Sequence, residues 1–164
     1  MSKVSIKYVL QNFPKAESER MDRLFKVAEK VINSEEFKGR VYGAYYDKKR
    51  QFAQNNGLTN EQIYQKAIEG AELSGPIDFI WQMDITYERG SRGVLGWTYP
   101  TEKRIWFNSR YFKTREDSGI VGTICHEQLH KLGFGHDFSS TKRRPYSVPY
   151  SIGTVCAELA EKLL

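Results

Sequence analysis

Three histidines and a glutamate in one short segment are the residues of this chain whose types and spacing are best suited to chemistry. They are His126, Glu127, His130 and His136, arranged as H-E-x-x-H-x-x-G-x-x-H, and they include all 3 histidines of the chain. On a helix, His126 and His130 lie one turn apart on the same face, where both can reach one metal ion. Three imidazole ligands leave a fourth position of zinc open for water or substrate. The segment therefore predicts a catalytic type of zinc site with one Zn²⁺.

The position of Glu127 predicts a role beside the metal rather than on it. The residue follows His126 directly, so on a helix its side chain is turned by about 100° from that of the histidine. A carboxylate there can take a proton from a zinc-bound water and pass it to a leaving amine. A zinc site that only stabilises a fold is closed by four protein ligands and needs no such base. The chemistry indicated is amide hydrolysis.

The helix that carries these residues can be placed from its expected ends. Asp117 or Ser118 is the predicted N-cap, and the helix is expected to run to Leu132. Gly133 is expected just beyond the end in a Schellman motif, with Phe134 packed back on the helix. That turn returns His136 as the third ligand. The predicted apolar face consists of Val121, Cys125, Leu129 and Leu132.

Two glycines of this helix, Gly119 and Gly122, are predicted to lie beneath the histidines. A glycine inside a helix is unfavourable by about 1 kcal/mol relative to alanine. Close approach of another segment would explain both residues, but a glycine in the first turn needs no such reason. The sequence leaves the two interpretations open.

The motif from His126 to His136 resembles the zinc signature of the metzincin clan of metallopeptidases. The resemblance implies a zinc-dependent endopeptidase that hydrolyses peptide bonds with one bound Zn²⁺, and its partner is a polypeptide substrate. By the same resemblance, His126, His130 and His136 hold the metal. Glu127 then activates the attacking water as general base and later acts as general acid.

Metzincins carry a methionine in a tight turn after this motif, and here the sequence departs from the pattern. All 3 methionines, Met1, Met21 and Met83, precede the motif. Residues 146–150 (YSVPY) resemble the turn with Pro149 in place of methionine, and the fixed φ of proline suits a turn. In some families a tyrosine near this turn reaches the zinc or steadies the oxyanion of the substrate. Tyr150 is therefore a candidate for substrate binding and Tyr146 a competing one, although each can equally be a packing or surface residue.

The resemblance also implies a small metzincin-like α+β domain. Its expected parts are a twisted mixed sheet with an antiparallel edge strand, an N-terminal helix, the zinc-binding active-site helix and a short C-terminal helical subdomain. We expect one domain over residues 1–164. Within it, residues 1–135 would hold the sheet and active-site helix, and residues 136–164 the small C-terminal subdomain.

Hydrophobic periodicity agrees with such a domain. Alternation predicts a strand over residues 3–10, and helical spacing predicts a helix from residue 18 onwards. The inner face of that helix would consist of Met21, Leu24, Phe25, Ala28, Val31 and Ile32. Further strands are predicted over residues 77–87, 94–99 and 103–108, as a meander with a turn at 100–102.

Two further helices are predicted from a cap and from periodicity. Thr59 is an expected N-cap, with Gln62 completing a capping box. The inner face that follows would be Ile63, Ala67, Ile68 and Ala71. A C-terminal helix is indicated by the spacing of Ile152, Val155, Cys156, Leu159 and Leu163. Residues 37–58 are rich in polar and aromatic residues, and a surface elaboration is their simplest interpretation, with a role in substrate access as the alternative.

The predicted edge strand is a candidate for substrate binding. In metzincins the edge strand upstream of the zinc helix lines the cleft, and the substrate pairs with it as an extra strand. The resemblance therefore implies that Gly96, Trp97 and Thr98 form the cleft wall. Trp97 can equally be a core residue, and the sequence leaves that choice open.

The composition agrees with one globular domain. The chain has 164 residues, of which 40% are hydrophobic, and this suffices for a core. No apolar stretch indicates a secretory signal or a membrane span, so we expect a cytoplasmic monomer with no membrane partner. The 2 cysteines, Cys125 and Cys156, fall on predicted apolar faces and are expected to be buried thiols, although a disulfide between them stays open.

A net charge of +5 introduces a second class of function. Basic clusters at residues 48–50 and 142–144 could bind phosphates, with Trp97 or Trp106 stacking on bases. Acidic residues number 20 and are interleaved, so an ordinary basic surface is the simpler interpretation. The same charge can attract an acidic polypeptide substrate. The alternative to an enzyme is a zinc-stabilised module that binds peptide or nucleic acid without catalysis, and Glu127 argues against it because such a module needs no base.

Overall fold

A mixed sheet runs through the molecule. The computed structural model describes residues 3–72, 75–99 and 103–164, and in these residues the strands are β1 (Ser5–Gln11), β2 (Ile80–Glu88), β3 (Gly96–Thr98) and β4 (Arg104–Asn108). Their order in the sheet is β1-β2-β4-β3. β1, β2 and β4 are parallel, while β3 at the edge runs antiparallel to β4. The predicted α+β class and the mixed sheet with an antiparallel edge strand are confirmed.

The strand order corrects the predicted meander. A meander would place β3 beside β2, but β4 pairs with β2 instead, in parallel, with Ile105 opposite Ile85. Ile105 and Phe107 of β4 are buried, whereas all residues of β3 are only half-buried. β4 has a paired strand on each edge and therefore lies inside the sheet, whereas the short β3 is tolerated at the edge. The predicted turn at residues 100–102 lies outside the described residues.

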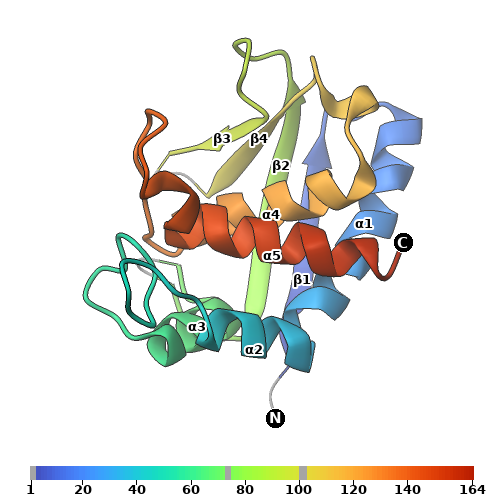
Figure 1. Cartoon of the computed structure of the whole chain (residues 1–164). Coiled ribbons are helices and arrows are strands. Elements are labelled where there is room, and N and C mark those ends of the chain that lie inside the picture. The colour runs from blue at the N-terminus through green and yellow to red at the C-terminus, as the bar shows by residue number, and fades with distance from the viewer. Residues whose placement is uncertain (1–2, 73–74, 100–102) are drawn as a thin grey trace.

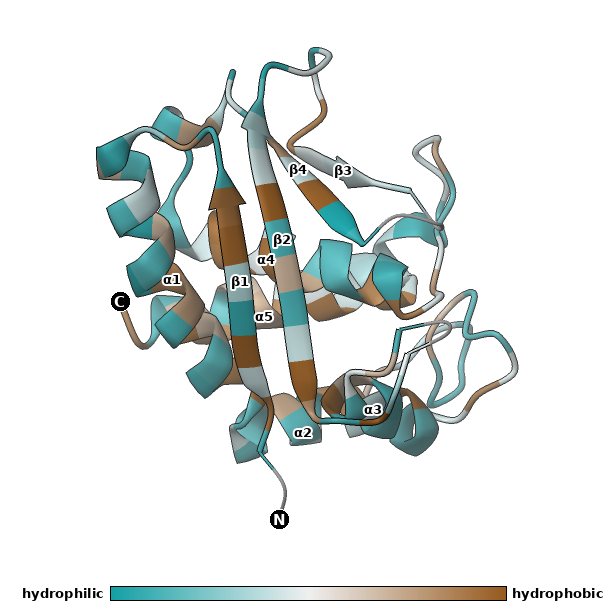
Figure 2. Ribbon diagram, turned by 180° about the vertical axis from the view of Figure 1, so that it is seen from behind, coloured by the Kyte–Doolittle hydropathy of each residue, from teal (hydrophilic) through white to brown (hydrophobic). Residues whose placement is uncertain are grey.

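Helices cover one face of this sheet (Figure 1). They are α1 (Lys15–Ile32), α2 (Glu35–Tyr42), α3 (Asn60–Glu69), α4 (Asp117–Lys131) and α5 (Val148–Glu161). α4 and α5 lie side by side across that face, and α1 packs next to them. Figure 2 shows the sheet from the opposite side, with β1 and β2 in front of α4 and α5. Along β1, Ser5, Lys7 and Val9 are exposed. One covered and one solvated face explain the alternation of apolar and polar residues along β1.

The predicted helices are found close to their expected positions. All of the residues predicted for the inner face of the first helix are buried in α1. The capping box is present, because the Gln62 N–H donates to the Thr59 hydroxyl at 3.2 Å and the Gln62 side chain accepts from the Thr59 N–H at 2.9 Å. Two predicted positions are wrong. Ala71 lies beyond the end of α3, and Leu163 lies beyond α5 and is exposed.

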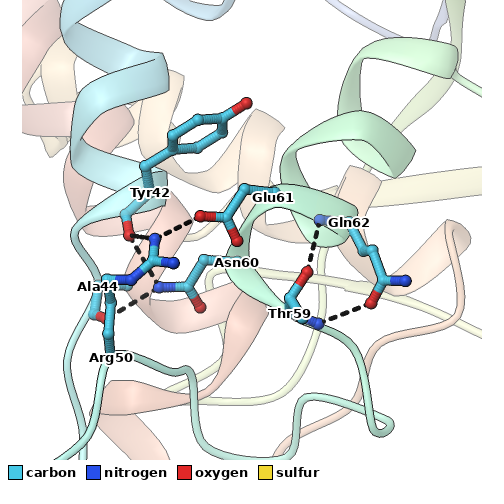
Figure 3. Close-up of polar contacts among 7 residues, drawn as sticks. All are labelled: Tyr42, Ala44, Arg50, Thr59, Asn60, Glu61 and Gln62. Atoms are coloured by element: carbon cyan, nitrogen blue, oxygen red, sulfur yellow. Dashed lines mark hydrogen bonds and ion pairs between the residues drawn. The ribbon is translucent and has the colours of Figure 1, made fainter.

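The segment from α2 to α3 is held by polar contacts rather than by a regular apolar face (Figure 3). The buried Asn60 amide donates to the carbonyls of Tyr42 and Ala44, each at 3.0 Å. Arg50 donates to the Tyr42 carbonyl at 2.8 Å and to the Glu61 carboxylate at 2.5 Å. Such contacts join residues far apart in sequence, so they leave no periodic signal.

The same segment supports two loops that flank α4 and α5. The Ala53 N–H donates to the Tyr146 carbonyl at 2.9 Å, just before α5. The Asn56 amide donates to the Gly133 carbonyl at 3.1 Å, just after α4. Residues 43–58 are therefore more than a surface elaboration, because they hold the ends of the two helices that carry the functional candidates.

A continuous apolar cluster joins the sheet to α1, α4 and α5. It extends from Val4 before β1 to Ala160 in α5, so α5 contributes to the same core as the sheet. Cys125 and Cys156 lie in this cluster as buried free thiols. Within the described part of the chain, no helix has the length and apolar character needed to cross a membrane.

Candidate metal centre

The start of α4 is positioned by an ion pair rather than by the predicted cap. The N-cap is Glu116, and Asp117 is the first residue of the helix, so the prediction of Asp117 or Ser118 as the cap is wrong. The Asp117 carboxylate accepts from Arg20 of α1 at 2.6 Å instead. A sequence pattern cannot show this, because the partner of the carboxylate lies on a distant helix.

The end of α4 has the predicted Schellman motif. Gly133 has a φ of 104°, a conformation that favours glycine. Its N–H donates to the His130 carbonyl at 3.0 Å, and the Phe134 N–H donates to the Leu129 carbonyl at 3.1 Å. Phe134 is buried. The turn ends the helix and directs the chain back towards the histidine face, where His136 lies.

One glycine of α4 allows α5 to approach closely. A Cβ on Gly122 would lie 2.8 Å from the Gly153 carbonyl oxygen of α5, and a Cβ on Gly153 would lie 3.2 Å from the His126 Cβ. The question left open by the sequence is thus answered for Gly122, since α5 is the approaching segment. Around Gly119 the nearest atom to an added Cβ is 3.7 Å away, so close approach does not require glycine there.

The three histidines meet at one point beside α4. Their ring centroids lie 4.9 Å apart for His126 and His130, 5.1 Å for His126 and His136, and 4.7 Å for His130 and His136. One ring nitrogen of each lies within 4.8 Å of the others, so together they could hold a metal ion. The residues that were predicted as ligands are therefore brought together.

Backbone carbonyls determine which ring nitrogens point to the centre of the cluster. His130 Nδ1 lies 2.8 Å from the Phe134 carbonyl oxygen, and His136 Nδ1 lies 2.8 Å from that of Asp137. Carbonyl oxygens only accept, so each Nδ1 carries the hydrogen. In a neutral ring, Nε2 is then an unprotonated acceptor.

His126 is held in a similar way. Its ring is hydrogen-bonded to the backbone of Pro149, which has no N–H and can only accept. Its Nε2 lies 3.2 Å from the Nε2 of His130. When both rings carry their hydrogen on Nδ1, the two Nε2 lone pairs face each other. Tetrahedral zinc with Zn–N bonds of about 2.0–2.1 Å would place two ligand nitrogens roughly 3.3 Å apart, so the spacing fits a shared cation.

Burial keeps these imidazoles neutral. Burial, and after it the two neighbouring histidines, lower the pKa of His126 to about 3. Burial also lowers the pKa of His130 to about 4 and lowers that of His136. The neutral ring is the form that binds a metal, so no proton has to leave before an ion is bound near neutral pH.

Glu127 is buried beside the histidines, with only 5% of its surface exposed. Burial raises the pKa of its carboxyl group to about 8. A carboxyl group with such a pKa can accept and release a proton near neutral pH. Glu127 also lines the cleft that contains His126 and His130, so its proton is within reach of a bound substrate.

Of the two candidate tyrosines, Tyr150 lies at the histidines. Its ring centroid is 4.6 Å from that of His126 and 4.5 Å from that of His136. Tyr146 is exposed and packs against Tyr46 instead, at 5.3 Å. The two side chains diverge because Tyr150 is in the first turn of α5, whereas Tyr146 ends the short 3₁₀ helix before it.

Arg144 is a residue of the site that the motif did not indicate. Its guanidinium lies over the ring of Tyr150, 4.7 Å from the centroid, and its Nη2 donates to the Tyr150 hydroxyl. The sequence shows Arg144 only as part of a basic cluster. Its place beside the histidines depends on how the 3₁₀ helix over Arg144–Tyr146 folds back in front of α5.

A cleft of about 1460 Å³ opens between β3 and the two helices. Gly96, Trp97 and Thr98 line it together with the histidines and Tyr150, so the predicted cleft residues lie where they were expected. Trp97 is half-buried and stacks on Trp106 at 6.1 Å, which answers the choice between core and cleft in favour of the cleft. The volume exceeds the roughly 300–1,000 Å³ of a small-molecule pocket, so there is room for a polymer.

Comparisons of the chain with protein-family models, with curated proteins and with solved structures found no match. The histidine cluster, the buried carboxyl group of Glu127 and the cleft beside β3 are thus the features that bear on function. Each is a property of this chain's own residues.

Proposed function

We propose that the chain is a zinc-dependent endopeptidase with a metzincin-like domain. The observation that supports the proposal most directly is the convergence of three histidine rings, two of them hydrogen-bonded through Nδ1 to a backbone carbonyl, next to a buried glutamate. A structural zinc site would need a fourth protein ligand. Among the described residues, the cluster contains three histidines and no further histidine, cysteine or carboxylate.

His126, His130 and His136 would hold the metal, and their carbonyl partners would fix the orientation of the rings. When bound, zinc supplies a Lewis acid for the substrate carbonyl and for the attacking water. The residues around it supply the rest of the reaction.

Glu127 carries the proton in this proposal. Its carboxylate takes a proton from the attacking water and delivers it to the amide nitrogen that leaves. Its raised pKa suits both steps, since a group with a pKa near neutral pH can both accept the proton and release it. Burial also keeps bulk water from competing for that proton.

Tyr150 and β3 would act on the substrate. Since the Tyr150 hydroxyl accepts from Arg144, its own hydrogen is free to donate to the carbonyl oxygen as negative charge develops there. β3 pairs with β4 on one side only among the described residues, so its other edge offers backbone groups to an extended peptide. A peptide bound there would pass the histidines.

The test compares the wild-type protein with Glu127→Gln after the zinc content of both has been measured. Each is incubated with a diverse peptide library, with and without a chelator, and cleavage is followed by mass spectrometry. We expect one zinc per chain in both proteins, chelator-sensitive cleavage by the wild type, and a loss of at least about 10²-fold in Glu127→Gln, the scale of general acid–base catalysis.

Two results would contradict the proposal. Cleavage that Glu127→Gln retains in full would remove the assigned base, and a wild-type protein that binds no zinc would remove the metal. Zinc binding without cleavage of any peptide would favour the non-catalytic peptide-binding module.

A further inference from the structure

Arg144 places a positive charge on the cleft next to the histidines. Its side chain lines the same cleft as His126 and His136. The guanidinium carbon lies over the ring of Tyr150, 4.7 Å from the ring centroid. Only the Nη2 contact with the Tyr150 hydroxyl is found for it among the described residues. Its Nε is buried and has no hydrogen-bond partner in that part of the chain.

The acidic residues nearby do not neutralise this charge. Asp137, the closest acidic residue before it in the chain, is bound by Arg143 at 2.7 and 2.8 Å and by Thr141 at 2.6 Å. Glu88 and Glu127 also line the cleft. Within residues 3–72, 75–99 and 103–164, neither of these two glutamates lies within ion-pair distance of Arg144. In the same residues, the neighbouring Arg143 forms an ion pair only with Asp137.

A half-buried guanidinium with open N–H groups is an incomplete site. Withdrawing a charge from water is unfavourable unless an opposite charge and hydrogen bonds replace the lost solvation. A carboxylate is the matching partner, because its two oxygens accept from the guanidinium edge as a fork. A neutral amide offers a single acceptor and no charge.

We propose that Arg144 recognises a carboxylate of the substrate, which is either an acidic side chain near the scissile bond or the free C-terminal carboxylate. This inference rests on the proposed peptidase function and names its substrate class. The net charge of +5 led to the general expectation of an acidic substrate. Arg144 assigns the binding of its carboxylate to a specific place in the cleft. The proposed carboxylate also gives the half-buried Arg144, whose Nε is buried without a hydrogen-bond partner among the described residues, a partner of opposite charge.

Pools of short peptides that differ only in their carboxylates test the inference. One pool has Asn and Gln in place of Asp and Glu and amidated C-termini, so it contains no carboxylate. A second pool restores the internal acidic residues, and a third restores only the free C-terminus. Cleavage by the zinc-loaded wild type is followed by mass spectrometry. Binding of the same pools to zinc-loaded Glu127→Gln is followed by fluorescence polarisation.

Three variants accompany the wild type. Arg144→Gln removes the guanidinium. Lys142→Gln removes the same charge from an exposed position in the same segment and serves as the matched control. Tyr150→Phe removes the hydroxyl that Arg144 contacts but keeps the guanidinium. For each variant the readout is the ratio between pools, because a general loss of activity lowers all pools alike.

We expect one carboxylate pool to be preferred over the neutral pool by about tenfold or more, the scale of a charge-assisted hydrogen bond. Arg144→Gln should lose this preference, whereas Lys142→Gln and Tyr150→Phe should keep it. Preference for the second pool identifies an acidic side chain, and preference for the third identifies the C-terminal carboxylate.

The inference would be overturned if the wild type cleaves and its Glu127→Gln variant binds all pools equally well. It would also be overturned if Arg144→Gln keeps the preference of the wild type for a carboxylate pool. The binding measurement separates this failure from that of the proposed function. Binding that depends on carboxylate and on Arg144, without cleavage, would support the inference while contradicting the peptidase. Absence of both binding and cleavage would overturn the inference as well.

Discussion

At the scale of single residues, Tyr150 combines two contacts that none of the other tyrosines near the site makes. Its ring packs against His126 and His136, and its hydroxyl accepts from Arg144. The first contact fixes the distance of the hydroxyl from the cluster, and the second directs its hydrogen away from the arginine. A hydrogen-bond donor in a fixed position is what a developing oxyanion needs.

Tyr150→Phe should therefore lower kcat by about 10²-fold, the effect of removing one oxyanion donor, with a smaller change in KM. The measurement is steady-state hydrolysis of one peptide identified from the library. Tyr146→Phe is the matched control and should behave as the wild type, since its side chain is exposed and directed elsewhere. Equal kcat values for the two variants would show that Tyr150 has only a packing role.

At the scale of secondary structure elements, the crossing of α4 and α5 determines how the site is built. Gly122 and Gly153 face each other where the helices touch, and the carbonyl of Pro149 in the first turn of α5 reaches the ring of His126. α5 therefore orients a ligand of the proposed metal although it contributes none. Any change that separates the helices should affect both stability and metal binding.

Gly122→Ala tests this contact. The new Cβ would lie 2.8 Å from a backbone carbonyl, so α5 must shift, and overpacking of this kind costs about 1–3 kcal/mol of the free energy of unfolding. Gly39→Ala in α2 is the control, because nothing lies within 4 Å of its Cβ. That variant should gain up to about 1 kcal/mol from helix propensity. Urea denaturation of both gives the comparison, and an unchanged stability of Gly122→Ala would mean that the helices adapt without strain.

At the scale of the whole molecule, the histidine cluster connects parts that are distant in sequence. His126 and His130 belong to α4, His136 follows the turn at Gly133, and residues 43–58 hold that turn through Asn56. A bound ion would thus join α4 to the loop and, through Pro149, to α5.

Removal of zinc by a chelator should lower Tm. At a free zinc concentration of about 100 times Kd, binding contributes roughly 2.7 kcal/mol, which corresponds to about 5–10 °C for a chain of this size. Calorimetry with and without chelator measures the shift. His130→Ala is the control, and its Tm should no longer respond to chelator. An equal Tm of the wild type with and without metal would contradict a site built around a cation.

Local features of the fold and site could be predicted from the sequence. Three such features are the histidine cluster, the Schellman motif at Gly133 and the capping box at Thr59, and all depend on spacings of a few residues. Helical periodicity and the φ of glycine act over the same range, so the pattern contains the physical cause. The mixed sheet with its antiparallel edge followed from a resemblance rather than from periodicity.

Other features were decided only by the tertiary structure. Contacts between distant residues place β4 between β2 and β3 and pair Asp117 with Arg20. Such contacts also bring Tyr150 to the histidines and Arg144 over its ring. Periodicity shows which residues are buried but not against which partner they pack. The sequence by itself therefore determined which histidines form the cluster and which carboxyl group lies beside it. The tertiary structure decided which further side chains surround them, because only the packing of α5 and β3 against α4 brings those side chains together.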